Sequence, residues 1–367
     1  MAEYKLTDGR IYAPAKKDPK VVEPGEYVIA AADLDHGHIY SMCEKLIAGG
    51  AVLKYVWDDK PEAIEAFVKR FPYVTVVDSV DRILEDPEVQ LVCAAGIPNE
   101  RADLCIRVME AGKDYFVDKA PMTTLAQVDA VRETIKRTGR RMWCYYCERL
   151  NHEGSLLAGY MVEAGEIGDV IQVLGTGGHR YGANPRPEWF HIHEQYGGIL
   201  GDIGSHQIEQ FLYFTKNKDA KILSARVGNY SYPQYPEFED FGDATLVGDN
   251  GALGYLRLDW HTPDGLRTWS DGRVYLLGTK GVIEVRKYED LGRPDLPGNM
   301  VYFANEKGEY VIDANGVTGT PFFSEMILDA LNRTENAMTQ EHTLKAAELC
   351  LKAQEQAVHV QYDLMKK

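Results

Sequence analysis

The chain has 367 residues, of which 45% are hydrophobic and 26% charged, and its formal net charge is -16. This length favours two domains over one small core, and the composition is that of an ordinary globular protein. The negative charge argues against nucleic acid or an anionic membrane as a partner, and no apolar run approaches the roughly 18 residues of a membrane span.

The first 150 residues predict an arm followed by an alternating α/β domain. Residues 1–26 hold prolines and lysines without periodicity, which is typical of an extended arm. Helical stretches then alternate with short apolar strands, which predicts a doubly wound parallel sheet of the Rossmann kind over residues 27–150. The expected strands are 27–32, 51–57, 74–77, 91–95, 115–117 and 141–147, and the expected helices are 40–48, 61–71, 80–84, 100–111 and 124–138.

The six cysteines do not predict a redox or metal motif. Cys144 and Cys147 have a C-x-x-C spacing, but residues 141–147 resemble a strand, where positions three apart point to opposite faces. We therefore expect reduced thiols and a cytoplasmic protein. The N-terminus also lacks the apolar core of a secretory signal.

From residue 151 the pattern changes to strands separated by turn pairs such as Asp271-Gly272 and Lys280-Gly281. Such turns join antiparallel strands. Residues 151–367 are therefore expected to form a second α/β domain, with one large, open, mainly antiparallel sheet and helices on one side. Its expected strands are 169–177, 222–232, 243–247, 252–260, 273–277, 281–286, 300–303 and 310–312, and its expected helices are 152–164, 321–331 and 343–364.

The turn after the first strand is the expected place for a dinucleotide. It spans residues 33–38 (DLDHGH) and holds one glycine, Gly37, where a dinucleotide turn usually holds several. Asp58 follows the second strand at about the distance of the acid that binds the ribose hydroxyls. A carboxylate there repels a 2′-phosphate, so Asp58 favours NAD over NADP. A surface acid that caps the next helix is the alternative interpretation.

A proton-handling site is predicted in the block 197–206. Its glycines precede an apolar helical run, and Asp202 and His206 stand four residues apart, so that on a helix they share one face. Lys119 ends the fifth expected strand. An acid, an imidazole and an ammonium group together can move a proton at a hydroxyl or carbonyl group. Taken singly, His206 is typical of a structural histidine and Lys119 of a solvated lysine.

The segment before this block supplies candidate substrate contacts, namely Arg180, Tyr181 and His193. Its aromatic residues suit a sugar ring, although a structural role explains them equally well. His191 and His193 would share one face of a strand, and that is the spacing of a metal pair. Without further recognisable ligands, no metal is predicted.

Several motifs, in this order, resemble those of the Gfo/Idh/MocA family, the glucose–fructose oxidoreductase and inositol dehydrogenase group. They are Pro98-Asn99, the run DKAP (118–121) where the family usually has Glu-Lys-Pro, Arg149, the run GEIG (165–168) and the block 197–206. The resemblance extends from residue 27 to the C-terminus. It departs at the first turn, where the family usually has glycines and this chain has Asp33, Asp35 and His38.

The resemblance implies NAD(P)-dependent oxidation or reduction at a carbon of a sugar, cyclitol or related polyol. Lys119 matches the family's catalytic lysine, Asp202 its substrate-orienting acid and His206 its proton-transferring histidine. NAD is the expected cofactor. Its expected contacts are Leu34, His36, Gly37, His38, Asp58, Ala95, Pro98, Asn99, Asp118, Lys119 and Arg149, and the expected substrate contacts are Lys119, Arg180, Tyr181, His193, Asp202 and His206.

Three activities remain open from the sequence. The first is net oxidation of a secondary hydroxyl group, including C3 of a glycoside to give a 3-keto glycoside. The second is NAD-dependent glycoside cleavage by transient oxidation and elimination, and the third is a non-catalytic NAD or sugar sensor. The expected open sheet leaves an apolar face that a second subunit would normally cover, so we expect a homo-oligomer.

Overall fold

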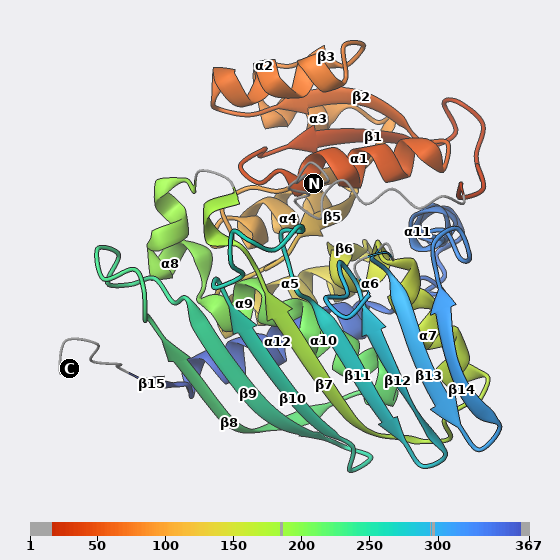
Figure 1. Ribbon diagram of the computed structural model, residues 1–367. Coiled ribbons are helices and arrows are strands. Elements are labelled where there is room, and N and C mark those ends of the chain that lie inside the picture. Colours follow the sequence, from red (N-terminus) through yellow and green to blue (C-terminus); the bar gives the residue numbers. More distant parts are fainter. Residues whose placement is uncertain (1–16, 184–185, 294, 296–297, 361–367) are drawn as a thin grey trace. The chain divides into compact units, whose positions relative to one another are not determined.

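The computed structural model describes residues 17–183, 186–293, 295 and 298–360 (Figure 1). Its described residues divide into two compact units. The Rossmann unit comprises residues 17–145 and 321–347, and the sheet unit comprises residues 146–320 and 348–360. Residues 1–16 of the predicted N-terminal arm lie outside the described residues.

The Rossmann unit contains a six-stranded parallel sheet in the order β3-β2-β1-β4-β5-β6. Its strands are β1 (Val28–Ala32), β2 (Val52–Trp57), β3 (Thr75–Val76), β4 (Val89–Ala94), β5 (Asp114–Asp118) and β6 (Met142–Tyr145), and its helices between strands are α1 (His38–Ala48), α2 (Pro61–Arg70), α3 (Val80–Glu85), α4 (Arg101–Glu110) and α5 (Leu125–Thr138). β1 and β5 are buried along their whole length, which explains the apolar runs VIAAA in β1 and YFV at the centre of β5. The strand order reverses between β1 and β4, where such sheets bind ligands. The predicted fold class is confirmed.

Residues 321–347 belong to the Rossmann unit, although the sequence pattern assigned them to the second half. Helix α11 (Phe322–Asn332) places Phe323 against Phe116, with ring centroids 6.3 Å apart. Arg333 pairs with Asp114 at 2.8 Å. Contacts over such a sequence separation cannot be deduced from local periodicity.

The sheet unit is built on nine strands in the order β14-β13-β12-β11-β7-β10-β9-β8-β15. Its strands are β7 (Val170–Gly178), β8 (Ala220–Gly228), β9 (Phe241–Gly248), β10 (Leu253–Asp259), β11 (Arg273–Gly278), β12 (Gly281–Arg286), β13 (Met300–Asn305), β14 (Gly308–Asp313) and β15 (Val358–Val360), and its helices are α6 (Cys147–Leu150), α7 (Glu153–Glu163), α8 (His193–Tyr196), α9 (Ile199–Asp202), α10 (Gly204–Thr215) and the end of α12 (Gln340–Glu355). The β7–β10 and β8–β15 pairs are parallel and the other pairs antiparallel. The predicted open, mainly antiparallel sheet is confirmed.

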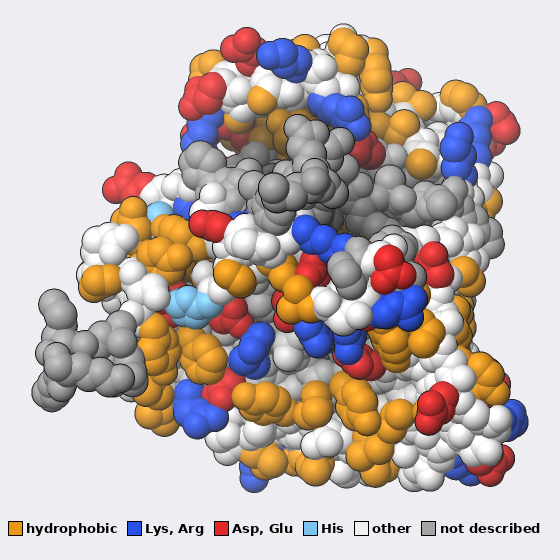
Figure 2. Space-filling view, viewed as in Figure 1, with side chains coloured by type: hydrophobic (Ala, Val, Ile, Leu, Met, Phe, Trp, Pro, Cys, Tyr) orange, Lys and Arg blue, Asp and Glu red, His pale blue; other side chains and the backbone are white. Residues whose placement is uncertain are grey.

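Helices α7, α9 and α10 pack on one face of this sheet. Gly177 of β7 permits the close approach of α10, because a Cβ atom there would lie 2.7 Å from Cγ2 of Ile203. No helix among the described residues covers the opposite face. Figure 2 shows hydrophobic side chains among charged ones over these strands. Leu253 and Val311 are exposed apolar residues on this face.

Three local predictions were wrong. The sixth strand ends at Tyr145, and Cys147 begins α6, so the two cysteines of the C-x-x-C spacing do not share a strand. His191 lies in a 3-10 helix and His193 begins α8, so they do not form the strand pair that suggested a metal site. The last helix ends at residue 355, and residues 358–360 form an unexpected strand.

Within the described residues, no helix has the length and apolar character required to cross a membrane.

Candidate active site

Asp58 lies beside the turn between β1 and α1. Its carboxylate accepts hydrogen bonds from the backbone N–H groups of Leu34 at 2.6 Å and of Lys60 at 2.7 Å. Asp58 is 5% exposed, and burial raises its pKa despite these hydrogen bonds. An acid after β2 that also contacts the first turn is placed as a ribose-binding carboxylate requires.

The acidic residues of this turn are largely neutralised. Asp35 forms an ion pair with Lys60 at 2.8 Å. Asp33 has a positive φ of 51°, a conformation that favours glycine. Burial, followed by the charges of Asp58 and Asp35, raises the pKa of Asp33 to about 7. This shift favours the uncharged form of Asp33, which lowers the repulsion that a diphosphate would meet here.

Two histidines of the turn converge on Asp118 at the end of β5. Nδ1 of His36 and Nδ1 of His38 each lie 2.7 Å from a carboxylate oxygen of Asp118. Burial opposes the charge of Asp118, but His38 and His36 hold its pKa well below the ordinary value. An ionised carboxylate can only accept, so Nδ1 of His38 donates to Oδ1 of Asp118. Burial, then His38, lowers the pKa of His36 to about 3, so His36 is neutral.

This triad also has the composition of a metal site. Among the residues that the structure describes, His36, His38 and Asp118 are the one group whose possible ligand atoms lie within 4.8 Å of one another. The guanidinium of Arg101 lies 3.6 Å from Asp118 and already supplies a positive charge. Hydrogen bonding and charge balance account for the cluster, and the absence of a metal stays a prediction.

Other predicted cofactor residues, namely Ala95, Pro98, Asn99 and Lys119, follow the carboxyl ends of β4 and β5, whereas Arg149 lies in α6 of the sheet unit. Ala95, just after β4, bonds through its N–H group to the carbonyl of Asp33 and through its carbonyl to the N–H group of His36, both at 2.9 Å. The Oδ1 atom of Asn99 is buried and accepts no hydrogen bond from the described part of the chain. Such an acceptor fits a polar ligand. Gly37 is the N-cap residue of α1, whose N-terminal N–H groups suit a diphosphate.

Asp202 and His206 lie on two consecutive helices of the sheet unit. Asp202 is the last residue of α9 and His206 lies in the first turn of α10, so the expected single helix is interrupted at Ile203. Ile203 keeps a helical conformation, and the four-residue spacing is preserved. Asp202 is 8% and His206 1% exposed. The Nε2 atom of His206 lies 3.9 Å from the Cys147 sulfur.

A buried charge network, which the sequence did not reveal, lies next to His206. Nζ of Lys287 lies 2.7 Å from Glu148, and Gln207 donates to the same carboxylate oxygen at 2.9 Å. His179 is 3.7 Å from its other oxygen. Burial opposes the charge of Glu148, but Lys287, then His206 and His179, hold its pKa well below the ordinary value. The one signal in the sequence is the polar run CER (147–149) directly after a buried strand.

The two arginines predicted to bind ligands hold the sheet unit together. Nε of Arg149 lies 2.7 and 3.0 Å from the two carboxylate oxygens of Glu209, and its guanidinium lies over the ring of Tyr213. Arg180 donates through Nη2 to the carbonyls of Pro263 and Thr268, at 3.0 and 2.9 Å. Contacts of either arginine with a ligand stay a prediction.

The aromatic residues of the sheet unit form a cluster. The hydroxyl of Tyr181 lies 2.7 Å from Nε2 of His191. The guanidinium of Arg186 lies 4.4 Å from the ring centre of Trp260, and Trp269 packs edge-on against Trp260. Flat apolar faces next to polar groups suit the ring of a sugar or cyclitol.

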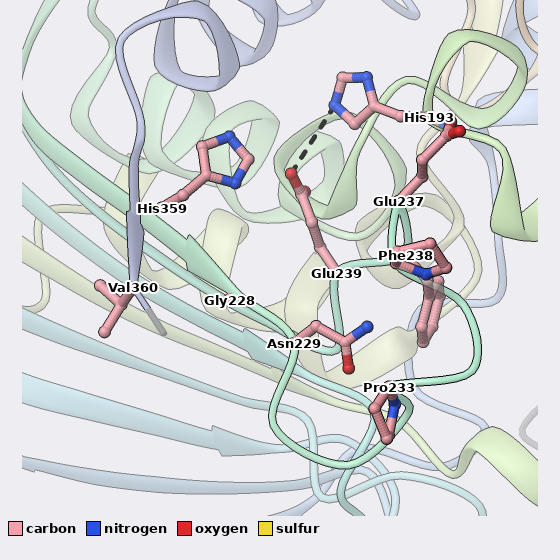
Figure 3. Close-up of a pocket in the computed structure, with 10 residues that line it drawn as sticks. His193, Gly228, Asn229, Pro233, Glu237, Phe238, Glu239, His359 and Val360 are labelled. Atoms are coloured by element: carbon pink, nitrogen blue, oxygen red, sulfur yellow. Dashed lines mark hydrogen bonds and ion pairs between the residues drawn. The ribbon is translucent and has the colours of Figure 1, made fainter. Parts of the chain in front are cut away.

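His193 lines a separate cavity of about 700 Å³ (Figure 3). Glu239 faces it, with a carboxylate oxygen 3.7 Å from Nε2 of His193. Glu239 also accepts a hydrogen bond from the N–H group of Ile199 at 2.8 Å. Ile199 begins α9, so the cavity adjoins the helix that ends in Asp202. Burial raises the pKa of Glu239 to about 7.

Comparison with known proteins identifies both units. A model of the oxidoreductase family with an NAD-binding Rossmann fold matches residues 36–146, and a model of the GFO/IDH/MocA C-terminal domain matches residues 156–284. The chain belongs to the GFO/IDH/MocA oxidoreductase family. The resemblance, the enzyme class and NAD as cofactor are thereby confirmed.

Individual members of the GFO/IDH/MocA family support this assignment. A crystal structure of a candidate oxidoreductase from Erwinia carotovora atroseptica SCRI1043 is 48% identical with a TM-score of 0.89, and the match covers 92% of this chain and 100% of that chain. The scyllo-inositol 2-dehydrogenase (NAD(+)) of Bacillus subtilis (strain 168) is 27% identical over 70% of this chain and 74% of its own length. A levoglucosan dehydrogenase in complex with NADH shares the fold, with a TM-score of 0.72 at 17% identity over 90% of this chain and 95% of that chain.

Proposed function

We propose that this protein is an NAD-dependent dehydrogenase that moves a hydride between nicotinamide and a carbon bearing a secondary hydroxyl group. Sugars, glycosides (including C3, to give a 3-keto glycoside) and cyclitols are its proposed substrates. The observation that carries the proposal is the buried Asp202–His206 pair in a member of this family. The inositol and levoglucosan substrates of two relatives and the aromatic cluster of the sheet unit support the substrate class.

Bound NAD supplies the hydride acceptor. His206, with a neutral imidazole, takes the hydroxyl proton of the substrate, and Asp202 orients the substrate. The ammonium group of Lys119 stabilises the negative charge that develops on the substrate oxygen. Asp58 accepts hydrogen bonds from the ribose hydroxyls of NAD. His36 and His38, held by Asp118, contact NAD beyond this ribose.

The test is a panel of inositols, aldoses, anhydrosugars and aryl glycosides, each incubated with the protein and NAD. We expect reduced nicotinamide to accumulate with at least one polyol, and His206→Asn to abolish it. His342→Asn, a histidine on α12, is the matched control and should keep full activity. Release of the aglycone without reduced nicotinamide would support redox-assisted cleavage instead. Binding of NAD or sugar with no turnover on any compound would support a sensor.

We also propose a homo-oligomer and a cytoplasmic location. The support for the oligomer is the uncovered face of the nine-stranded sheet, because extended sheet faces with exposed apolar residues normally pack against another surface. The support for the location is the scattered arrangement of the cysteines.

A further inference from the structure

The charge network beside His206 is more extensive than a structural ion pair requires. Glu148 is 1% exposed, and the side chain of Lys287 is fully buried. One carboxylate oxygen of Glu148 receives both Lys287 and Gln207. Its other oxygen, Oε1, is buried and has no hydrogen-bond partner among the described residues. Nε2 of His179 lies 3.7 Å from this oxygen. A buried carboxylate oxygen in this state keeps its negative charge available to its neighbours.

Glu148 lies close to His206. Gln207, the residue after His206, donates to Glu148 at 2.9 Å, and the sulfur of Cys147, the residue before Glu148, lies 3.9 Å from Nε2 of His206. The charge of His206 also contributes to the low pKa of Glu148, and by reciprocity Glu148 favours a protonated His206. His206 gains a positive charge when it takes a proton, in a place where it is only 1% exposed. A buried imidazolium needs a nearby negative charge, and Lys287 opposes it.

We propose that the buried pair of Glu148 and Lys287 sets the proton affinity of His206, with the carboxylate raising it and the ammonium group lowering it. Both are positioning residues, because they act on the substrate only through His206. This inference rests on the proposed function of His206 as the group that takes the hydroxyl proton.

Other charged groups near His206 do not replace this pair. Arg149 and Glu209, which connect α6 with α10, neutralise each other. Arg257 and Asp259 of β10 also pair, and the Arg257 side chain is 41% exposed. Asp202 contributes a carboxylate from α9 itself. The titratable or charged groups on the elements around His206 include Cys147, Glu148 and Arg149 on α6, Glu153 on α7, His179 after β7, Asp202 on α9, Glu209 on α10, Asp259 on β10, and Lys287 after β12.

Opposite substitutions separate this role from a structural one. Glu148→Gln leaves the ammonium group and should lower the pKa of His206 by about one unit, whereas Lys287→Met leaves the carboxylate and should raise it by about one unit. On the acid side, one unit is a tenfold change in kcat/KM at a fixed pH. The double variant should fall between the two single variants. Glu153→Gln removes a buried carboxylate that binds the backbone N–H groups of Gly316 and Thr318, and should move neither quantity.

The measurements are the pH profile of kcat/KM and the NMR titration of the His206 imidazole in the full-length protein, assigned with His206→Asn. Shifts in opposite directions for the two single variants support the inference. Shifts in the same direction, or no shift, overturn it, because the loss of a purely structural contact would not change the pKa of His206 according to the charge that is removed. If one single variant does not fold, the direction in the other decides. If neither single variant folds, His206 in the double variant should titrate close to its wild-type value, and a shift of one unit or more overturns the inference.

The same data distinguish this inference from the proposed function. If the NMR titration moves as expected but the wild-type pH profile does not follow it, the pair controls His206 and the proposed role of His206 in catalysis is wrong. If the wild-type profile follows His206 but the variants do not shift it, the proposed function holds and the role of the pair is wrong.

Discussion

The turn between β1 and α1 and the charge network beside α10 shift the pKa values of buried carboxylates in opposite directions. In the turn, Asp33 has other acids as neighbours, and its pKa rises to about 7. Beside α10, Glu148 is more deeply buried, yet Lys287 holds its pKa below the ordinary value. The sheet unit shows the same contrast internally. Burial raises the pKa of Glu239 to about 7, although the hydrogen bonds from Ile199 and Gln354 oppose this shift. A neighbouring cation, rather than burial, therefore decides which carboxylates stay charged.

This contrast assigns different tasks to the two regions. The raised pKa of Asp33 makes the charge of the turn between β1 and α1 sensitive to pH in the physiological range. Glu148 beside α10 stays ionised over that range, so its negative charge next to the proposed proton-transferring group is constant.

The largest effect is expected from loss of the proton-transferring group. His206→Asn should lower kcat by about 10²- to 10⁴-fold, since general base catalysis contributes that much. Lys119→Met should lower kcat by a similar factor and raise KM for the substrate less. Steady-state rates with the best polyol of the panel measure both. If turnover of His206→Asn stays within a factor of two of the wild type, the proposed role of His206 in proton transfer is wrong.

A smaller effect is expected from the acid beside the turn. Asp58→Asn loses the charge, and because the amide has a single oxygen it keeps one of the two hydrogen bonds from Leu34 and Lys60. We expect kcat/KM for NAD to fall about 10-fold and the preference for NAD over NADP to narrow, because the 2′-phosphate is no longer repelled. Asp59→Asn, with a side chain 72% exposed, is the control. Equal cofactor preference in both variants would show that Asp58 only caps the turn.

The pH dependence of stability gives a still smaller effect. The pKa values of Asp33 and Glu239 are raised to about 7 in the folded protein, so both groups favour folding below the unfolded pKa and lose this contribution as pH rises through about 7. Between pH 6 and 8 the loss is at most about 1 kcal/mol for Glu239, and less for the partly exposed Asp33. Chemical denaturation at several pH values should show a shallower slope in Glu239→Gln than in the wild type. An identical slope would mean that Glu239 is ionised throughout.

The smallest effect on turnover is expected at the open sheet face. Tyr275 of β11 lies at its centre, between Leu174 and Glu284 on the neighbouring strands. Tyr275→Lys should reduce the molar mass measured by light scattering to that of one chain and leave kcat nearly unchanged. A wild-type protein that is already monomeric at micromolar concentration would contradict the proposed oligomer.

The parts of the fold that depend on local pattern could be predicted from the sequence. Buried parallel strands such as β1 and β5 contain apolar runs, and the turn pairs mark the antiparallel strands. Residues 321–347 were assigned to the wrong unit, because their partners Phe116 and Asp114 are distant in the chain. The short helices at residues 188–196 were missed, since single turns have no periodicity to detect.

The candidate site was predictable where residue types have a fixed spacing. The Asp202–His206 pair and the acid after β2 follow from spacing and position at a strand end. The network of Glu148, Lys287 and His179 could not be found, because it joins three separate segments and each residue alone is typical of a surface or structural position. The neutralised turn also required coordinates, since the Asp35–Lys60 pair has no sequence signature.

The most direct test of the central claim follows the hydride itself. A polyol substrate labelled with deuterium at the reacting carbon is incubated with the protein and NAD, and the nicotinamide product is analysed by mass spectrometry. One deuterium per turnover on the nicotinamide ring is the predicted result, and in His206→Asn the labelled nicotinamide should form more slowly, in proportion to the lower kcat. Substrate conversion with the deuterium found only in water would contradict hydride transfer and with it the proposed function.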